Sequence, residues 1–133
     1  MSLEYAVERW RETFELFDDD MELYQHLIDQ GRQLQKDPLP EELRTEATRV
    51  SRCQYNLFVA PVDSKFKAYS DGMIASGYAY MLLDIFNNAS IEEVAECDPA
   101  QIGQQLGIRE ILSTNRSNGF YQMMDLMKHQ VQQ

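Results

Sequence analysis

Among the side chains that could carry out covalent chemistry, the thiol of Cys53 has the most reactive setting. It lies at the start of an apolar run and follows two arginines, Arg49 and Arg52. Only a thiolate is a good sulfur nucleophile, and nearby cationic side chains raise the thiolate fraction at neutral pH. The second cysteine, Cys97, has no such neighbours and is expected to pack inward. Cys53 is therefore the candidate nucleophile, and the alternative interpretation is a small buried core residue.

Motifs for metals and cofactors are missing from the sequence. The two cysteines do not form a Cys-x-x-Cys pair, and His26 has no second ligand candidate at metal-binding spacing. There is also no Gly-rich phosphate loop, dinucleotide fingerprint, His-Glu-x-x-His helix or serine-nucleophile elbow. The acidic clusters at residues 18–20 and 41–42 are better explained as helix caps and solvated surface. We expect neither a bound metal nor a bound cofactor.

Length and charge limit the classes of function. The chain has 133 residues, which fits a single domain over residues 1–133. Its net charge of −10 disfavours general binding to nucleic acid or to an anionic membrane, and favours a basic or mixed-charge protein partner. The N-terminus shows no secretory signal, and the longest uncharged stretch, residues 72–83, is shorter than the ~20 apolar residues of a membrane span. We expect a cytoplasmic protein whose cysteines stay reduced.

Two amphipathic helices are predicted at the N-terminus, because apolar residues recur there at spacings of three and four. The acidic run at residues 18–20 separates them and offers a cap to the second. The apolar positions of the first helix are Leu3, Val7, Trp10, Phe14 and Phe17, and those of the second are Met21, Tyr24, Leu27, Ile28 and Leu34.

A small antiparallel sheet is predicted in the middle of the chain. Pro38 and Pro40 end the helical region, and residues 41–50 are interpreted as a short turn followed by an edge strand. Residues 55–60 favour a strand that ends before a proline, and residues 65–69 favour its hairpin partner. Cys53 would then lie in a loop on the approach to a strand, where functional groups are often presented.

A helix that is apolar almost all round follows the hairpin, over residues 73–86, with Ser70-Asp71 as its expected N-terminal cap. It is predicted to be the central packing element. Short helices are expected after Ser90 and from Pro99, the latter ending at Gly103 or Gly107, and a last helix contains residues 118–119. The fold class is α/β (α+β), with a small antiparallel sheet of about three strands packed against several helices.

Several motifs occur in one characteristic order. Two N-terminal helices precede Leu-Pro-Glu-Glu-Leu-Arg at residues 39–44, then Val50 to Gln54, then Ser70-Asp71 before the apolar helix, and finally Arg-Ser-Asn-Gly at residues 116–119. In this order and spacing the chain resembles the SufE family of sulfur-acceptor proteins. The resemblance runs from about residue 14 to residue 127 and implies a fold similar to the IscU-type scaffold.

The resemblance implies a mechanism and a partner. In the SufE family an essential cysteine, matched here by Cys53, takes sulfur from the persulfide of a pyridoxal-phosphate cysteine desulfurase, stimulates that enzyme, and passes the sulfur toward an iron–sulfur scaffold or other recipient. Chemically this is thiolate attack on the outer sulfur of a persulfide. Gln54, Asp71 and Arg116 match family positions near the cysteine loop or the partner-facing surface. Arg116 could support the thiolate or bind the desulfurase, or form an ordinary ion pair at a helix start.

Some residues depart from the family pattern. Arg52 occupies the position before the cysteine where the family usually has glycine, and is expected to stiffen the loop while strengthening the positive field around the thiol. Tyr55 stands where serine is common, Phe58 where tryptophan is common, and Ile111 where a histidine is often found. These differences bear on which desulfurase is served and how strongly it is stimulated.

Three alternatives are weighed against a sulfur carrier. An iron–sulfur scaffold needs about three cysteine or similar ligands, and this chain has two cysteines. A module that binds and regulates a desulfurase without carrying sulfur would not need the thiol at all. A helical domain unrelated to the family, with the motifs present by chance, is the third.

Overall fold

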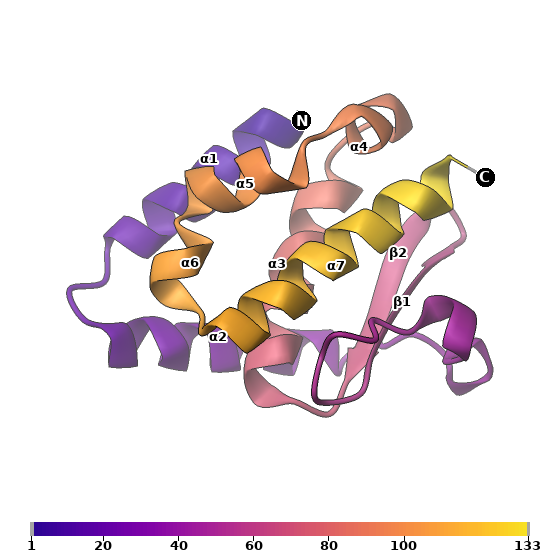
Figure 1. Ribbon diagram of the computed structural model, residues 1–133, viewed down its shortest axis with the longest axis horizontal. Coiled ribbons are helices and arrows are strands. Elements are labelled where there is room, and N and C mark those ends of the chain that lie inside the picture. The colour runs from indigo at the N-terminus through magenta and orange to yellow at the C-terminus, as the bar shows by residue number, and fades with distance from the viewer. Residues whose placement is uncertain (1, 133) are drawn as a thin grey trace.

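A computed structural model describes residues 2–132 and shows packed helices with a two-stranded sheet at one side. In chain order the elements are α1 (Leu3–Glu15), α2 (Asp20–Leu34), the 3-10 turns η1 (Glu41–Leu43) and η2 (Glu46–Thr48), β1 (Leu57–Val62), β2 (Lys65–Ser70), α3 (Met73–Asn87), α4 (Ile91–Glu96), α5 (Pro99–Leu106), α6 (Ile108–Ile111) and α7 (Thr114–Val131). Figure 1 shows α7 running in front of α3, with the hairpin on one side and α5 and α6 on the other.

The N-terminal helices form where the apolar spacing predicts them. Ser2 caps α1 and Asp19 caps α2, each accepting a hydrogen bond from a backbone N–H of the first turn. The α1 face that contains Trp10 and Phe14 is buried, and the Trp10 indole N–H donates to Asp84 of α3 at 2.8 Å. Acidic residues at the first turn of α2 favour its N-terminus electrostatically.

The sheet has two strands, so the predicted edge strand within residues 41–50 is wrong. Strands β1 and β2 pair antiparallel from Leu57 opposite Ser70 to Val62 opposite Lys65. Before them the chain forms η1 and η2; the N–H of Leu39 donates to the carbonyl of Ala68 at 3.0 Å, and an isolated bridge joins Arg49 to Phe58. The reason is local: the hydroxyl of Thr48 donates to the carbonyl of Leu43 at 2.7 Å, and turn hydrogen bonds satisfy the backbone without a ladder.

Helix α3 is the central element, as predicted from its apolar composition. It packs on α2 and β2, and it also contacts α1 and α7. Its N-cap is Gly72, without a side-chain hydrogen bond, so the expected cap at Ser70-Asp71 is wrong. The carboxylate of Asp71 is instead directed at Asn56, and the Ser70 hydroxyl accepts from the backbone N–H of Gly72.

Helices α2 and α3 approach each other closely at two glycines. A Cβ on Gly77 would lie 2.2 Å from the carbonyl oxygen of Leu27, and one on Gly31 would lie 2.8 Å from the Cβ of Ser76. Such distances leave no room for a side chain, so these glycines permit backbone contact between the helices. This contact sets the position of α3 against α2 within the core.

The C-terminal half follows the expected caps. Ser90 and Glu93 form a capping box at α4, and Pro99 starts α5. Helix α5 ends at Gly107, which adopts φ 70°, a left-handed conformation that favours glycine; Gly103 lies inside the helix. The one-turn helix α6 was not predicted. Residues 118–119 lie within α7, as predicted. None of the helices in residues 2–132 has the length and apolarity to cross a membrane.

Candidate functional site

The loop between η2 and β1 places Cys53 against α7. The backbone N–H of Val50 donates to the carbonyl of Leu57 at 2.8 Å, which closes the loop at its base. The loop crosses α7 at Gly119, where a Cβ would lie only 3.6 Å from the Cα and Cβ of Cys53. Cys53 is 9% exposed and its thiol is free. The predicted loop position is correct, and the thiol is sheltered there.

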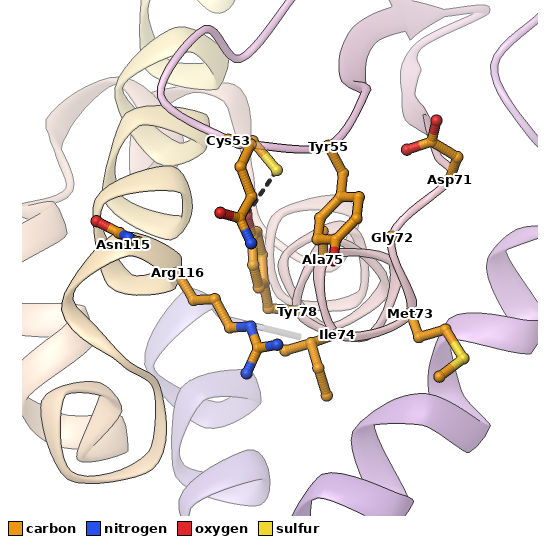
Figure 2. Close-up of a pocket in the computed structure, with 11 residues that line it drawn as sticks. Cys53, Tyr55, Asp71, Gly72, Met73, Ile74, Ala75, Tyr78, Asn115 and Arg116 are labelled. Carbon is orange, nitrogen blue, oxygen red and sulfur yellow. Dashed lines mark hydrogen bonds between the residues drawn. The ribbon is translucent and has the colours of Figure 1, made fainter.

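A pocket of about 190 Å³ opens beside the thiol (Figure 2). Its walls come from the cysteine loop, the β2–α3 turn, the first turns of α3 and the start of α7. It is lined by Cys53, Gln54, Tyr55, Asp71, Gly72, Met73, Ile74, Ala75, Tyr78, Asn115 and Arg116. Four of the five residues singled out from the sequence therefore meet here, although they are spread over more than sixty positions.

Arg52 does not line this pocket. Its exposed side chain borders a neighbouring groove together with Arg109, Asp98 and Asp125, and its backbone N–H donates to Gln122 of α7. Arg49 forms an ion pair with Glu46 at 3.8 Å. The expectation that these two arginines surround the thiol was based on sequence proximity, and the structure directs them elsewhere.

Tyr78 of α3 contacts the thiol directly, and its hydroxyl donates to the Cys53 Sγ at 3.7 Å (Figure 2). Burial raises the pKa of the Tyr78 hydroxyl, and the adjacent Cys53 raises that pKa further. The hydroxyl therefore keeps its proton as a donor. Gly119 makes room for it, since a Cβ there would lie 2.5 Å from the Tyr78 oxygen. Sequence periodicity identified Tyr78 only as core, because a core face and a pocket face look alike in a helix.

A pH prediction follows from the raised pKa of Tyr78. Above pH about 10, the ordinary tyrosine value, the unfolded chain loses this proton while the folded chain keeps it, so the free energy of unfolding falls as pH rises. The contribution approaches about 1.4 kcal/mol per pH unit. We expect Tyr78→Phe to remove it and to give a shallower slope in urea unfolding between pH 10 and about 11.5. Tyr5→Phe, at an exposed tyrosine, is the matched control. Equal slopes for Tyr78→Phe and the unmodified chain would contradict the assignment.

Arg116 supplies positive charge to the pocket from the first turn of α7. Its side chain is half-buried and projects toward the pocket in Figure 2. No carboxylate within residues 2–132 pairs with it at salt-bridge distance. Its charge lowers the pKa of Tyr78, against the larger effect of burial, so the field of Arg116 reaches the hydroxyl that contacts the thiol. An anionic sulfur in this pocket would be favoured by both groups.

Asp71 anchors the far end of the cysteine loop. Its carboxylate accepts hydrogen bonds from the backbone N–H and the side-chain amide of Asn56, both at 2.9 Å. The backbone N–H of Asp71 donates to the carbonyl of Asn56 at 3.3 Å. Gln54 is exposed at the pocket rim. Asp71 therefore acts on the loop through hydrogen bonds.

Gln122 of α7 holds the near end of the loop. Its Oε1 accepts from the backbone N–H of Arg52 at 2.5 Å, and its Nε2 donates to the hydroxyl of Ser51 at 2.8 Å. No sequence signal pointed to this residue, because its partners lie some seventy positions away and a glutamine on a helix surface is common.

Cys97 is unsuited to the same chemistry. It caps the end of α4, is buried, and lies outside the pocket. Burial raises the pKa of its thiol, which disfavours the thiolate, even though the charge of Lys128 acts in the opposite direction. No group of three or more potential metal ligands occurs in the part of the chain that the structure describes.

Comparison with known proteins decides the family. The model of the SufE family, described as an Fe-S metabolism associated domain, matches residues 8–131. The chain belongs to the SufE family. Among SufE relatives, an uncharacterised SufE-like protein of Rhizobium etli is 27% identical over 127 residues, covering 90% of this chain and 84% of the relative. The sulfur acceptor protein CsdE of Escherichia coli is 28% identical over 119 residues, covering 86% and 80%.

The SufE assignment agrees with the fold. A solution structure of a hypothetical protein from Thermus thermophilus superposes with a TM-score of 0.70 at 21% identity, covering 99% of this chain and 96% of that one. At this identity the likeness concerns the fold alone. It confirms the predicted mixture of helices with a small antiparallel sheet for this SufE-family chain.

Proposed function

We propose that this chain accepts sulfur on Cys53 from the persulfide of a cysteine desulfurase, stimulates that enzyme, and delivers the sulfur to iron–sulfur cluster assembly in the cytoplasm. The observation that carries the proposal is the position of the thiol. It lines a pocket together with Tyr78, whose hydroxyl donates to it, and Arg116, in a chain of the SufE family. A relative named as a sulfur acceptor supports the same interpretation.

The transfer step is a thiol exchange without net oxidation. The Cys53 thiolate attacks the outer sulfur of the desulfurase persulfide, forming a new S–S bond on Cys53. The S–S bond of the donor breaks, and the desulfurase cysteine leaves as a thiolate with the bonding electron pair. The pyridoxal phosphate that generates the first persulfide belongs to the desulfurase. This chain supplies the accepting thiolate and a place for the product.

The pocket suits the anionic product. A water-sized group needs roughly 15 Å³ of such space, so about 190 Å³ leaves ample room for one added sulfur atom. The Tyr78 hydroxyl is a donor for the negative sulfur, and the Arg116 guanidinium supplies favourable charge. Burial of Cys53 limits contact of the persulfide with other thiols in solution.

The same burial requires the loop to move during transfer, because a buried sulfur cannot reach a second protein's active site. Arg52 and Gln54 are exposed on the loop, and we assign them to contact with the desulfurase. Tyr55 and Met73 are exposed apolar side chains at the pocket rim and extend this surface.

Intact-mass measurement tests the proposal. The chain is incubated with an active cysteine desulfurase, pyridoxal phosphate and cysteine, and compared with Cys53→Ser and Cys97→Ser. We expect a reducible gain of one sulfur in the unmodified chain and in Cys97→Ser, and none in Cys53→Ser. A gain retained by Cys53→Ser would place the carried sulfur on another residue and rule out Cys53 as the carrier. A gain absent from every variant, although the proteins bind, would favour a module that regulates the desulfurase by binding.

A further inference from the structure

Gln122 is placed to control access to the thiol. Both polar atoms of its side-chain amide are used: the oxygen accepts from the backbone N–H of Arg52, and the nitrogen donates to the hydroxyl of Ser51. Both partners lie immediately before Cys53 in the chain. One side chain of α7 therefore holds the loop at the two positions that must move if the cysteine is to turn outward.

The bonding of the loop backbone shows why this contact matters. The N–H of Val50 belongs to the loop base, and the N–H of Cys53 donates weakly within the loop, to Val50 at 3.3 Å. The N–H of Arg52 is directed at the glutamine and has no backbone partner among the described residues. A side-chain amide can accept from a backbone N–H through its oxygen and donate to a hydroxyl through its nitrogen at the same time.

The loop is held at both ends on different elements. Gln122 fixes residues 51 and 52 to α7, and Asp71 fixes Asn56 to the turn before α3. Between these points, Cys53 lies across Gly119, where no side chain separates the loop from the helix. The Arg52 side chain is exposed, so the backbone of this residue, rather than its charge, connects it to α7.

We propose that Gln122 is a positioning residue that holds the cysteine loop in its sheltered state and sets how often Cys53 becomes accessible. This inference rests on the proposed function for its meaning in sulfur transfer. Release of the glutamine lets residues 51 and 52 leave α7 and carries the thiol out of the pocket. The desulfurase reaches Cys53 only in that open state.

The test uses the free protein and Ellman's reagent, with Cys97→Ser as the background so that one thiol reports. We expect Gln122→Ala to raise the rate of Cys53 modification about tenfold, because two hydrogen bonds that favour the closed loop are lost. Gln122→Glu keeps an acceptor for the Arg52 N–H, and the Ser51 hydroxyl can rotate to donate, so its rate should stay within about threefold of the background. Gln104→Ala, at an exposed glutamine of α5, is the matched control and should leave the rate unchanged.

Hydrogen exchange at the Arg52 amide gives a second readout that a general loss of stability would not produce alone. We expect faster exchange at this amide in Gln122→Ala, with the urea midpoint close to that of the background. An unchanged modification rate would overturn the proposal. The proposal would also be overturned if Gln122→Glu raised the modification rate as much as Gln122→Ala does, and if both increases followed the loss of global stability. The thiol-modification experiment contains no desulfurase, so a negative result for Gln122 leaves the sulfur-acceptor proposal standing. In the same way, a failure of sulfur transfer would leave the measured accessibility of Cys53 interpretable.

Discussion

Replacing Cys53 by serine is expected to abolish the stimulation of a cysteine desulfurase by this chain while leaving the two proteins able to bind. A serine hydroxyl has nearly the shape of the thiol but does not ionise near neutral pH, so it cannot attack the outer sulfur of a persulfide. The desulfurase would keep its persulfide and turn over at its unassisted rate. The measurement is the rate of alanine formation from cysteine, with and without the chain, beside a binding titration of the same proteins.

Cys97→Ser is the matched control for this prediction. Its sulfur is also buried, but it lies at the end of α4 and outside the pocket. We expect this variant to stimulate the desulfurase as the unmodified chain does. Full stimulation by Cys53→Ser would contradict the carrier mechanism and identify the chain as a regulator that acts by binding.

The largest effect on stability is expected from Gly77→Ala. The added Cβ would lie 2.2 Å from the carbonyl oxygen of Leu27 and 2.7 Å from its carbonyl carbon. These are backbone atoms of α2 and cannot rotate away, so the two helices would have to separate along their most extensive contact. Overpacking of this kind costs about 3 kcal/mol or more. The loss in the free energy of unfolding is measured by urea titration, with circular dichroism as the signal. The neighbouring Tyr78 would be displaced together with α3.

Gly72→Ala is the matched control, because it makes the same glycine-to-alanine substitution away from the contact between α2 and α3. A Cβ at Gly72 would meet the ring of Tyr55 at 2.9 Å and its Cβ at 3.0 Å. The exposed ring can turn aside, and the small further shift that the Tyr55 Cβ requires falls on an exposed loop rather than on a packed helix. Its cost should stay near about 1 kcal/mol, including the poorer N-cap. If Gly77→Ala lost no more stability than Gly72→Ala, the close contact between α2 and α3 would be contradicted.

Long periodic segments were predictable because the spacing of apolar residues within each segment shows which of its faces is buried. The spacing of apolar residues identified α1, α2, α3 and α7, and the β-branched and aromatic runs identified β1 and β2. The extra strand failed because local hydrogen bonds, such as that of Thr48 to Leu43, outcompete strand pairing in a polar segment. Asp71 was mistaken for a helix cap because capping and loop anchoring call for the same side chain.

The candidate site was only partly visible in the sequence. Motif order identified Cys53, Gln54, Asp71 and Arg116, and the structure places all four around one pocket. Tyr78 and Gln122 could not be found in this way. Their contacts with the loop join residues 25 to 71 positions apart, and nothing in the local sequence of α3 or α7 distinguishes a pocket tyrosine from a core one.

The amide of Gln122 carries no net charge. Salt should therefore act differently on the two steps of transfer, which are the encounter of the two proteins and the opening of the cysteine loop. With its net charge of −10, the chain is expected to meet a basic partner surface through long-range forces that dissolved salt weakens. The closure at Ser51 and Arg52 depends on short hydrogen bonds that salt hardly screens. In the proposed transfer we therefore expect ionic strength to change how often the two proteins meet, and to leave the rate at which the loop exposes the thiol nearly unchanged.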